Sequence, residues 1–164
     1  MNPHEWSLNI LESKGGNLDE KDWVILEALQ ENARIGFAEL GRRVGLSAPT
    51  VAERINRLQD EGTITGYHAT VDPSNLGLGL PVFIRITVSN KDYSKFKEFV
   101  NRTVEILECY HVTGAESFML KVRVASVQAL EDLIGRLNPY GQTATSLLLS
   151  TCLERRTFRK PARS

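Results

Sequence analysis

The sequence predicts an α+β protein with two domains, the first helical and the second built from alternating strands and helices. The hydrophobic period changes from about 3.6 residues to 2 residues near Gly62, which marks a change from helices to strands. Residues 72–81 contain two prolines and two glycines, a composition typical of a hinge. A chain of 164 residues is long enough for two small domains. We therefore expect a first domain at 18–71, a hinge at 72–80 and a second domain at 81–158.

Composition places the chain among ordinary globular proteins. Hydrophobic residues make up 41% and charged residues 24%, which excludes a wholly disordered or collagen-like chain. Twenty Lys and Arg residues balance twenty Asp and Glu residues, so the total charge does not indicate a cationic, non-specific nucleic-acid binder. Local clustering of charge still allows a sequence-specific one. Cys109 and Cys152 have no partner at metal-ligand spacing, so we expect reduced thiols, no metal and no cofactor.

Both ends of the chain are predicted to be accessory segments. Residues 1–17 have no sustained apolar period and are expected to form a flexible arm. They contain no signal-peptide pattern, and the longest apolar runs are far below the ~20 residues that span a bilayer, so we expect a cytoplasmic protein without membrane contact. Residues 159–164 form a basic tail, which is either solvated or lies along phosphates.

The first domain contains the pattern of a helix-turn-helix motif at about 37–56. Two amphipathic helices are separated only by Gly45, Leu46 and Ser47, where Gly45 ends one helix and Ser47 caps the next. A further helix with acidic residues in its first turn precedes them. The β-prone residues 63–71 then predict a wing, so the expected domain is a winged helix-turn-helix.

The third helix is predicted to bury Val51, Ile55 and Leu58 and to turn a polar face outward. Several of its outward residues are types that contact base edges or phosphates, and the helix start suits a phosphate oxygen. The predicted DNA-binding residues are Arg42, Arg43, Ser47, Pro49, Thr50, Glu53, Arg54, Asn56 and Arg57.

The spacing alone leaves a second interpretation open, namely a generic three-helix bundle with a polar surface. Residues 18–66 hold six basic and nine acidic residues, but five of the basic residues lie within 34–57, so the surface is expected to be polarised. If the DNA-binding interpretation holds, Thr50→Ala and Arg57→Ala weaken DNA binding and leave the fold intact, because both residues are assigned to the face opposite the apolar one.

The second domain is predicted to follow the order βαββαβ of a ferredoxin-like fold. Two helices cover one face of such a sheet, and a second copy of the chain is the simplest cover for the other face. The expected strands are 82–88, 106–112, 118–124 and 143–154, and the expected helices are 95–101 and 127–137.

Five stretches in order and spacing resemble the Lrp/AsnC family, the leucine-responsive or feast/famine transcriptional regulators of bacteria and archaea. The resemblance extends over about 18–157 and implies a sequence-specific DNA-binding regulator rather than an enzyme. It also implies a second domain of the type called RAM, which forms dimers and often octamers and binds small effectors, commonly amino acids. The matching stretches are 18–22, 30–34, 37–47, 51–58 and 62–67.

The resemblance places an effector site at the turn before the third predicted strand. Ser117 stands where the family often has Asp, and a hydroxyl cannot supply the charge that pairs with an ammonium group. Glu116 carries a charge, but in a strand its side chain points to the opposite face. We therefore expect weak binding of free amino acids and tighter binding after Ser117→Asp. The expected effector-binding residues are Gly114, Ala115, Glu116, Ser117, Thr143 and Thr145.

Two alternatives stay open beside an effector-responsive regulator. One is a DNA-wrapping nucleoid protein that responds to no effector, which the absence of Asp at position 117 favours. The other is a subunit of siroheme decarboxylase, an enzyme class that shares this architecture but carries histidine-rich motifs in the second domain. That domain contains only His111 here, and we identify no catalytic residue.

Overall fold

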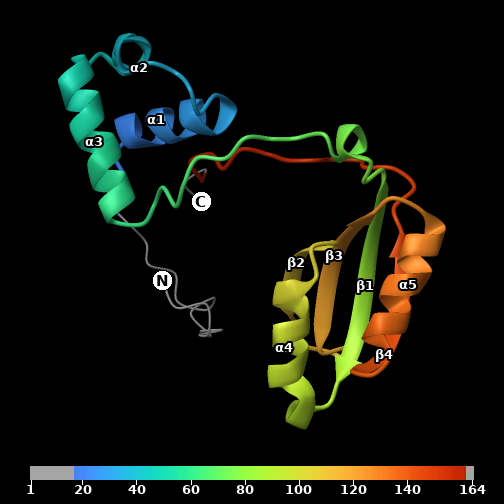
Figure 1. The fold of residues 1–164 in the computed structure, drawn as a ribbon. Helices are drawn as coiled ribbons and strands as arrows, with labels where there is room; N and C mark the ends of the chain where they lie inside the picture. The colour runs from blue at the N-terminus through green and yellow to red at the C-terminus, as the bar shows by residue number, and fades with distance from the viewer. Residues whose placement is uncertain (1–16, 162–164) are drawn as a thin grey trace. The chain divides into compact units, whose positions relative to one another are not determined.

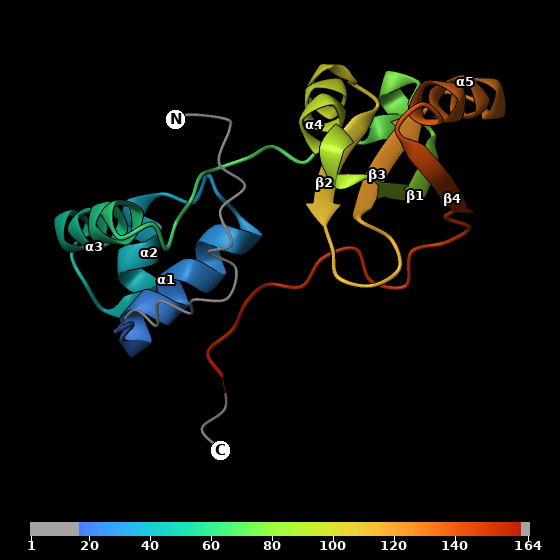
Figure 2. The same cartoon turned by 90° about the horizontal axis from the view of Figure 1, so that it is seen from below.

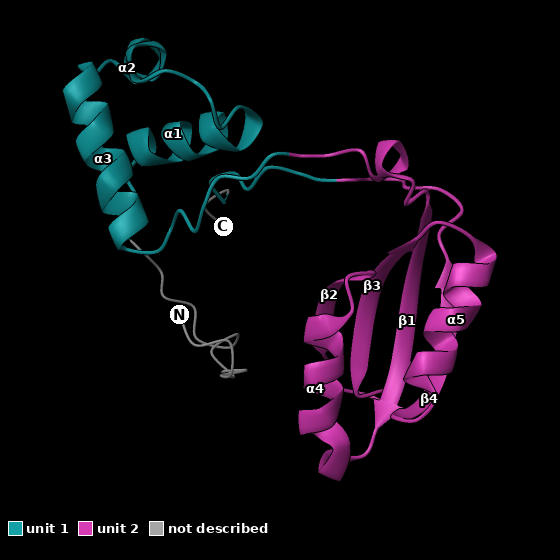
Figure 3. Cartoon of the chain, in the orientation of Figure 1, with its two compact units in different colours: residues 1–69, 155–164 teal, residues 70–154 magenta. Residues whose placement is uncertain are grey.

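The computed structural model describes residues 17–161 in two compact units (Figure 3). One unit combines 17–69 with 155–161, and the other contains 70–154. The C-terminal segment that begins at Arg155 therefore groups with the helical unit and not with the sheet. Most of the predicted flexible arm, residues 1–16, and the last three residues of the basic tail lie outside the described residues.

The helical unit contains three helices, α1 (Glu20–Glu31), α2 (Phe37–Val44) and α3 (Ala48–Asp60) (Figure 1). Asp19 caps α1 by accepting a hydrogen bond from the Asp22 N–H, and the Asp22 side chain accepts one from the Asp19 N–H in return. The three predicted helices are confirmed. Their shared core is fully or almost fully buried and consists of Ile25, Ala28, Leu40, Val44, Val51, Ile55 and Leu58.

The expected wing does not form. Residues 63–71 contain no strand, and all of them except Ile64 are exposed. Ile64 donates its N–H to the Leu58 carbonyl at 3.0 Å and packs on the helical core, so the first residues after α3 continue its cap. β-branched residues form a strand only beside a partner strand, and none pairs with this segment among the described residues.

The sheet unit has the predicted order βαββαβ, with four antiparallel strands in the spatial order β2-β3-β1-β4. Two short 3₁₀ turns, Pro73–Leu76 in the hinge and Asn90–Asp92 before α4, complete it. The last strand ends at Leu147, seven residues earlier than expected, and Leu149 beyond it is 96% exposed. The elements are β1 (Leu80–Val88), α4 (Tyr93–Arg102), β2 (Ile106–His111), β3 (Phe118–Val124), α5 (Val127–Leu137) and β4 (Gly141–Leu147).

The two faces of the sheet differ in what covers them. Alternate residues of β1 and β3, such as Ile84 and Leu120, are buried against α4 and α5. Figure 2 shows both helices on this one face. No described helix of the sheet unit covers the other face, where Phe83 and Met119 are only half-buried. The sheet unit alone thus leaves one partly apolar face without a cover.

Candidate nucleic-acid interface

The turn between α2 and α3 is packed directly onto α2. Gly45 ends α2 with a φ of 66°, the left-handed conformation that glycine adopts most easily. Gly41, one turn earlier, accepts a hydrogen bond from the Leu46 N–H at 2.9 Å. A Cβ added at Gly41 would lie 2.5 Å from the Leu46 carbonyl oxygen. Glycine at both positions therefore permits the short, tightly packed turn between α2 and α3.

The start of α3 presents two hydroxyl groups. The Ser47 hydroxyl accepts a hydrogen bond from the Thr50 N–H at 3.3 Å and lies 2.8 Å from the Thr50 hydroxyl. Pro49 sits in the first turn, where no helical partner is lost. Ser47 and Pro49 are exposed and Thr50 is half-buried. The positive end of the α3 dipole therefore opens to solvent, which suits an anion.

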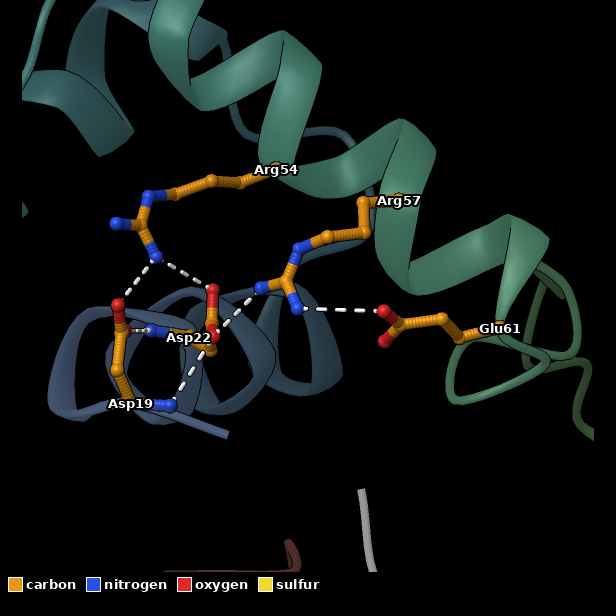
Figure 4. A network of polar contacts seen from close by, with 5 residues as sticks. All are labelled: Asp19, Asp22, Arg54, Arg57 and Glu61. Atoms are coloured by element: carbon orange, nitrogen blue, oxygen red, sulfur yellow. Dashed lines mark hydrogen bonds and ion pairs between the residues drawn. The ribbon is translucent and has the colours of Figure 1, made fainter. Parts of the chain in front are cut away.

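Arg54 and Arg57 of α3 point toward α1, where they bind Asp22 (Figure 4). The Asp22 side chain is only 1% exposed, and one of its oxygens lies 2.8 Å from Arg54 Nη1 and the other 2.7 Å from Arg57 Nη2. Arg54 Nη1 also lies 2.6 Å from Asp19 Oδ2, and Arg57 Nη1 lies 3.3 Å from Glu61 Oε1. The buried carboxylate is thus matched by two guanidinium groups, as a buried charge requires.

The network shifts several ionisation equilibria. The hydrogen bond from the Asp22 N–H, followed by that from Arg54, lowers the pKa of Asp19. Hydrogen bonds to Asp19 and Asp22 raise the pKa of Arg54, and the bond to Asp22 raises the pKa of Arg57. Because the pKa of Asp19 is lower in the folded state, its contribution to stability is present at neutral pH. That contribution is lost as the pH falls through the folded-state value.

These contacts correct the expected position of Arg57. The sequence placed Arg57 on a free face opposite the core, but its guanidinium is one of the two partners of buried Asp22. Arg57→Ala is therefore not a neutral change for the fold. Among the remaining predicted residues of α3, Pro49, Glu53 and Asn56 are exposed.

Arg42 and Arg43 at the end of α2 share one partner, Glu39. Arg43 Nε lies 3.3 Å from Glu39 Oε1, and Arg42 contacts the other carboxylate oxygen. The hydrogen bonds from Arg42 and then Arg43 lower the pKa of Glu39. The side chains of Arg42 and Arg43 are 73% and 47% exposed, so both remain accessible to a phosphate.

Sequence reasoning missed two residues that shape this site, Asp22 and Gly41. The pattern indicates Asp22 only as an acid at a helix start, although Asp19-x-x-Asp22 is the spacing of a capping box. Its pairing with arginines 32 and 35 positions later carries no local signal. Gly41 had a usable signal, because a glycine inside a helical pattern often marks a close backbone contact.

In the sheet unit, the predicted effector loop already uses its two polar side chains. The Ser117 hydroxyl accepts from the Val88 N–H and donates to the Val88 carbonyl, both at 3.2 Å, and so fastens β3 to the end of β1. Glu116 Oε1 lies 3.0 Å from Arg85 Nη1. The Ala115 carbonyl accepts from the Thr87 hydroxyl at 3.3 Å, and Gly114 has a positive φ of 123°.

The other two predicted effector residues lie on the far side of β1. Thr143 and Thr145 belong to β4, where they are in register with Ile86 and Ile84 of β1. Since β1 separates β4 from β3, about two strand spacings, roughly 9–10 Å, lie between them and the Ser117 loop. One chain therefore does not bring the six predicted effector residues together in a single cluster.

The part of the chain that the structure describes contains neither a membrane span nor a metal cluster. No helix within 17–161 is long and apolar enough to cross a membrane. The same residues hold no group of three or more His, Cys, Asp or Glu side chains placed to bind a metal ion. His111 stacks on Phe118 with ring centroids 4.9 Å apart and meets Tyr93 edge-on.

A helix-turn-helix with an exposed α3, followed by a ferredoxin-like sheet, defines a class of two-domain DNA-binding regulators. The AsnC-type helix-turn-helix domain matches residues 18–59, and the Lrp/AsnC ligand binding domain matches residues 81–158. The chain belongs to the Lrp/AsnC family. It is a DNA-binding transcriptional regulator with a ligand-binding domain, as the resemblance of its sequence implied.

Named relatives are similar over most of their length. The chain is 39% identical over 133 residues to the HTH-type transcriptional regulator LrpC of Bacillus subtilis, which spans 81% of this chain and 92% of that protein. The solved structure of that LrpC has a TM-score of 0.81 at 37% identity and covers 85% of this chain and 100% of its own. A Neisseria meningitidis regulator in complex with L-methionine has a TM-score of 0.81 at 27% identity, covering 86% and 96%.

Asp22→Asn is expected to destabilise the helical unit. The substitution removes the buried charge that both arginines bind, and hydrogen bonds to charged groups typically contribute about 1.5–3 kcal/mol. Arg54 and Arg57 are 25% and 40% exposed and recover part of the loss from water, so we expect about 1–3 kcal/mol. Urea denaturation followed by circular dichroism measures it. Glu61→Gln, which removes only an exposed partner of Arg57, is the control, and equal midpoints for the two variants would contradict the assignment.

Proposed function

We propose that this regulator reads duplex DNA with α3, assembles through the open face of its sheet and responds to an amino acid or a related small molecule. The observation that carries the proposal is the exposed start and outer face of α3, held at a fixed angle by the glycine turn and the Asp22 network. The protein then acts in the cytoplasm, associated with the nucleoid, and has no enzymatic role.

The side chains on the exposed part of α3 suit the major groove. An Asn side chain pairs with the N6 and N7 atoms of adenine, a Glu carboxylate accepts from the cytosine amine, and an apolar group packs on the thymine methyl. Asn56, Glu53 and Pro49 supply these three groups. The hydroxyls of Ser47 and Thr50 and the guanidinium groups of Arg42 and Arg43 suit phosphates beside the groove. The guanidinium groups of Arg54 and Arg57 are partly exposed and also suit contacts with phosphates.

Asn56→Ala and Thr50→Ala are expected to weaken binding to a selected operator. Removing one good base or phosphate interaction typically costs about 1–3 kcal/mol, or roughly tenfold in affinity. Neither side chain contacts Asp22, so the fold should persist. Fluorescence anisotropy at fixed salt measures the affinity, and Gln128→Ala in α5 serves as the control. If both α3 variants bind as tightly as the wild type, α3 is not the reading helix.

The open face of the sheet has the character of a self-association surface. Phe83 of β1 and Met119 of β3 lie on it half-buried, next to Lys121, whose ammonium lies 2.8 Å from a Glu108 carboxylate oxygen. This ion pair partly neutralises the charge beside the apolar residues, which favours burial. A second copy bringing the same face satisfies two-fold symmetry and buries apolar surface in both chains. We propose a dimer built on this face and an octamer built from dimers.

Phe83→Asp is expected to shift the assembly toward monomer. A carboxylate at the centre of a closed interface loses its hydration without gaining a partner. Light scattering across a concentration series measures the mass of the particle. Val104→Asp is a matched control, because Val104 is an apolar residue that is 85% exposed and lies outside the strands. A Phe83→Asp variant with the wild-type mass would rule out the sheet face as the principal interface.

The effector proposal rests on the ligand-binding domain match and on the solved relative that holds L-methionine. The Ser117 loop offers few free hydrogen-bond acceptors to a ligand. The Ser117 hydroxyl is hydrogen-bonded to the Val88 backbone, and the Glu116 carboxylate is paired with Arg85. The same observation favours the alternative of a DNA-wrapping nucleoid protein without an effector. An effector that binds the folded state raises the apparent melting temperature, whereas an effector-independent protein shows no such shift.

Ser117→Asp is expected to strengthen amino-acid binding by roughly tenfold. A charged hydrogen bond contributes about 1.5–3 kcal/mol against about 1 kcal/mol for a neutral one. A carboxylate at this position can still accept from the Val88 N–H, but it faces the Val88 carbonyl, which reduces the gain. Calorimetry with a panel of amino acids on both proteins tests this. Micromolar binding by the wild type that Ser117→Asp leaves unchanged would show that other groups recognise the ammonium.

A further inference from the structure

The C-terminal segment 155–161, which includes the described part of the basic tail, lies on α1 of the helical unit. Gln30 near the end of α1 donates from Nε2 to the Phe158 carbonyl at 3.0 Å, and its Oε1 accepts from the Phe158 N–H at 2.9 Å. Two residues further on, the Lys160 ammonium pairs with Glu20, the first residue of α1. The segment 155–161 is therefore fastened at both ends of α1.

This segment changes the charge of the DNA-binding unit. Residues 17–69 hold six basic and nine acidic residues, a net charge of −3, which opposes approach to a polyanion. Residues 155–161 hold four basic residues and no acidic residue. With the segment in place, the described part of the unit has a net charge of +1.

The segment also supplies cations that no acid within residues 17–161 occupies. The four arginines of α2 and α3, at positions 42, 43, 54 and 57, are all paired with Asp or Glu. Arg155, Arg156 and Arg159 are exposed, and within residues 17–161 none of the three has an ion pair. These three guanidinium groups are therefore accessible to an anion without the displacement of a carboxylate of residues 17–161.

The docked segment reaches the end of α1 that contacts α3. Glu20, which binds Lys160, follows Asp19, and the Asp19 carboxylate contacts Arg54 of α3. The end of α1 that Lys160 reaches is thus the end that contacts α3.

We propose that residues 155–160 form a second, phosphate-binding element of the DNA-binding unit, held against α1 by Gln30 and Glu20. This inference rests on the proposed binding of DNA through α3. The segment adds affinity that depends on salt but not on sequence, because it contacts the backbone and not the bases.

The test compares the salt dependence of DNA binding in the full-length protein. Fluorescence anisotropy with a mixed-sequence duplex gives the slope of log affinity against log salt from about 50 to 200 mM, and each neutralised phosphate contributes about 0.9 to that slope. The triple variant Arg155→Gln, Arg156→Gln, Arg159→Gln is expected to reduce the slope by about 0.9 for each phosphate that it no longer neutralises. The matched control is Lys91→Gln, Lys95→Gln, Arg102→Gln, which removes three exposed charges from the sheet unit.

A second variant separates docking from charge. Gln30→Ala keeps every charge of the segment but removes both hydrogen bonds to Phe158. We expect it to bind DNA several-fold more weakly than the wild type, because the freed segment must be ordered again on binding. The inference is overturned if the tail triple variant keeps the wild-type slope or if Gln30→Ala binds like the wild type. A wild-type protein that binds no duplex would overturn the proposed function and this inference together.

Discussion

The helical unit depends on the burial of one carboxylate, that of Asp22, between two guanidinium groups of α3. An ionised carboxylate out of water is costly unless it is paired and hydrogen-bonded, so this contact fixes where α3 lies relative to α1. The same residue closes the capping box of α1. A single side chain thus connects the start of α1 with the orientation of α3.

Local signals in the sequence were sufficient for the three helices, the glycine turn and the order of the sheet unit. Gly45, Ser47 and Ser126 stop or cap their helices through bonds to near neighbours, so spacing alone identifies them. The contacts that the sequence did not predict join residues that are far apart along the chain, such as Arg57 with Asp22 and Ser117 with Val88. The prediction of a wing was wrong for a related reason. Residues 63–71 have a high strand propensity, but a strand forms only when a partner strand pairs with it.

The arginines of the proposed DNA-binding surface are paired with the protein's own acids in the absence of DNA. Under the proposed function, a phosphate meets arginine side chains that are already held in place, so less side-chain ordering opposes binding. Glu39 restrains Arg42 and Arg43 in this way, and Asp22 restrains the arginines of α3. A surface of this kind favours discrimination between sequences over tight attachment to any duplex, which is consistent with a balanced net charge.

The contact of Phe158 with α1 limits where the chain can be cut into separate domains. The sheet unit, residues 70–154, is in effect inserted between two parts of the helical unit. A cut at the hinge separates the three helices from the segment that Gln30 and Glu20 bind, so a fragment that ends there lacks these C-terminal partners.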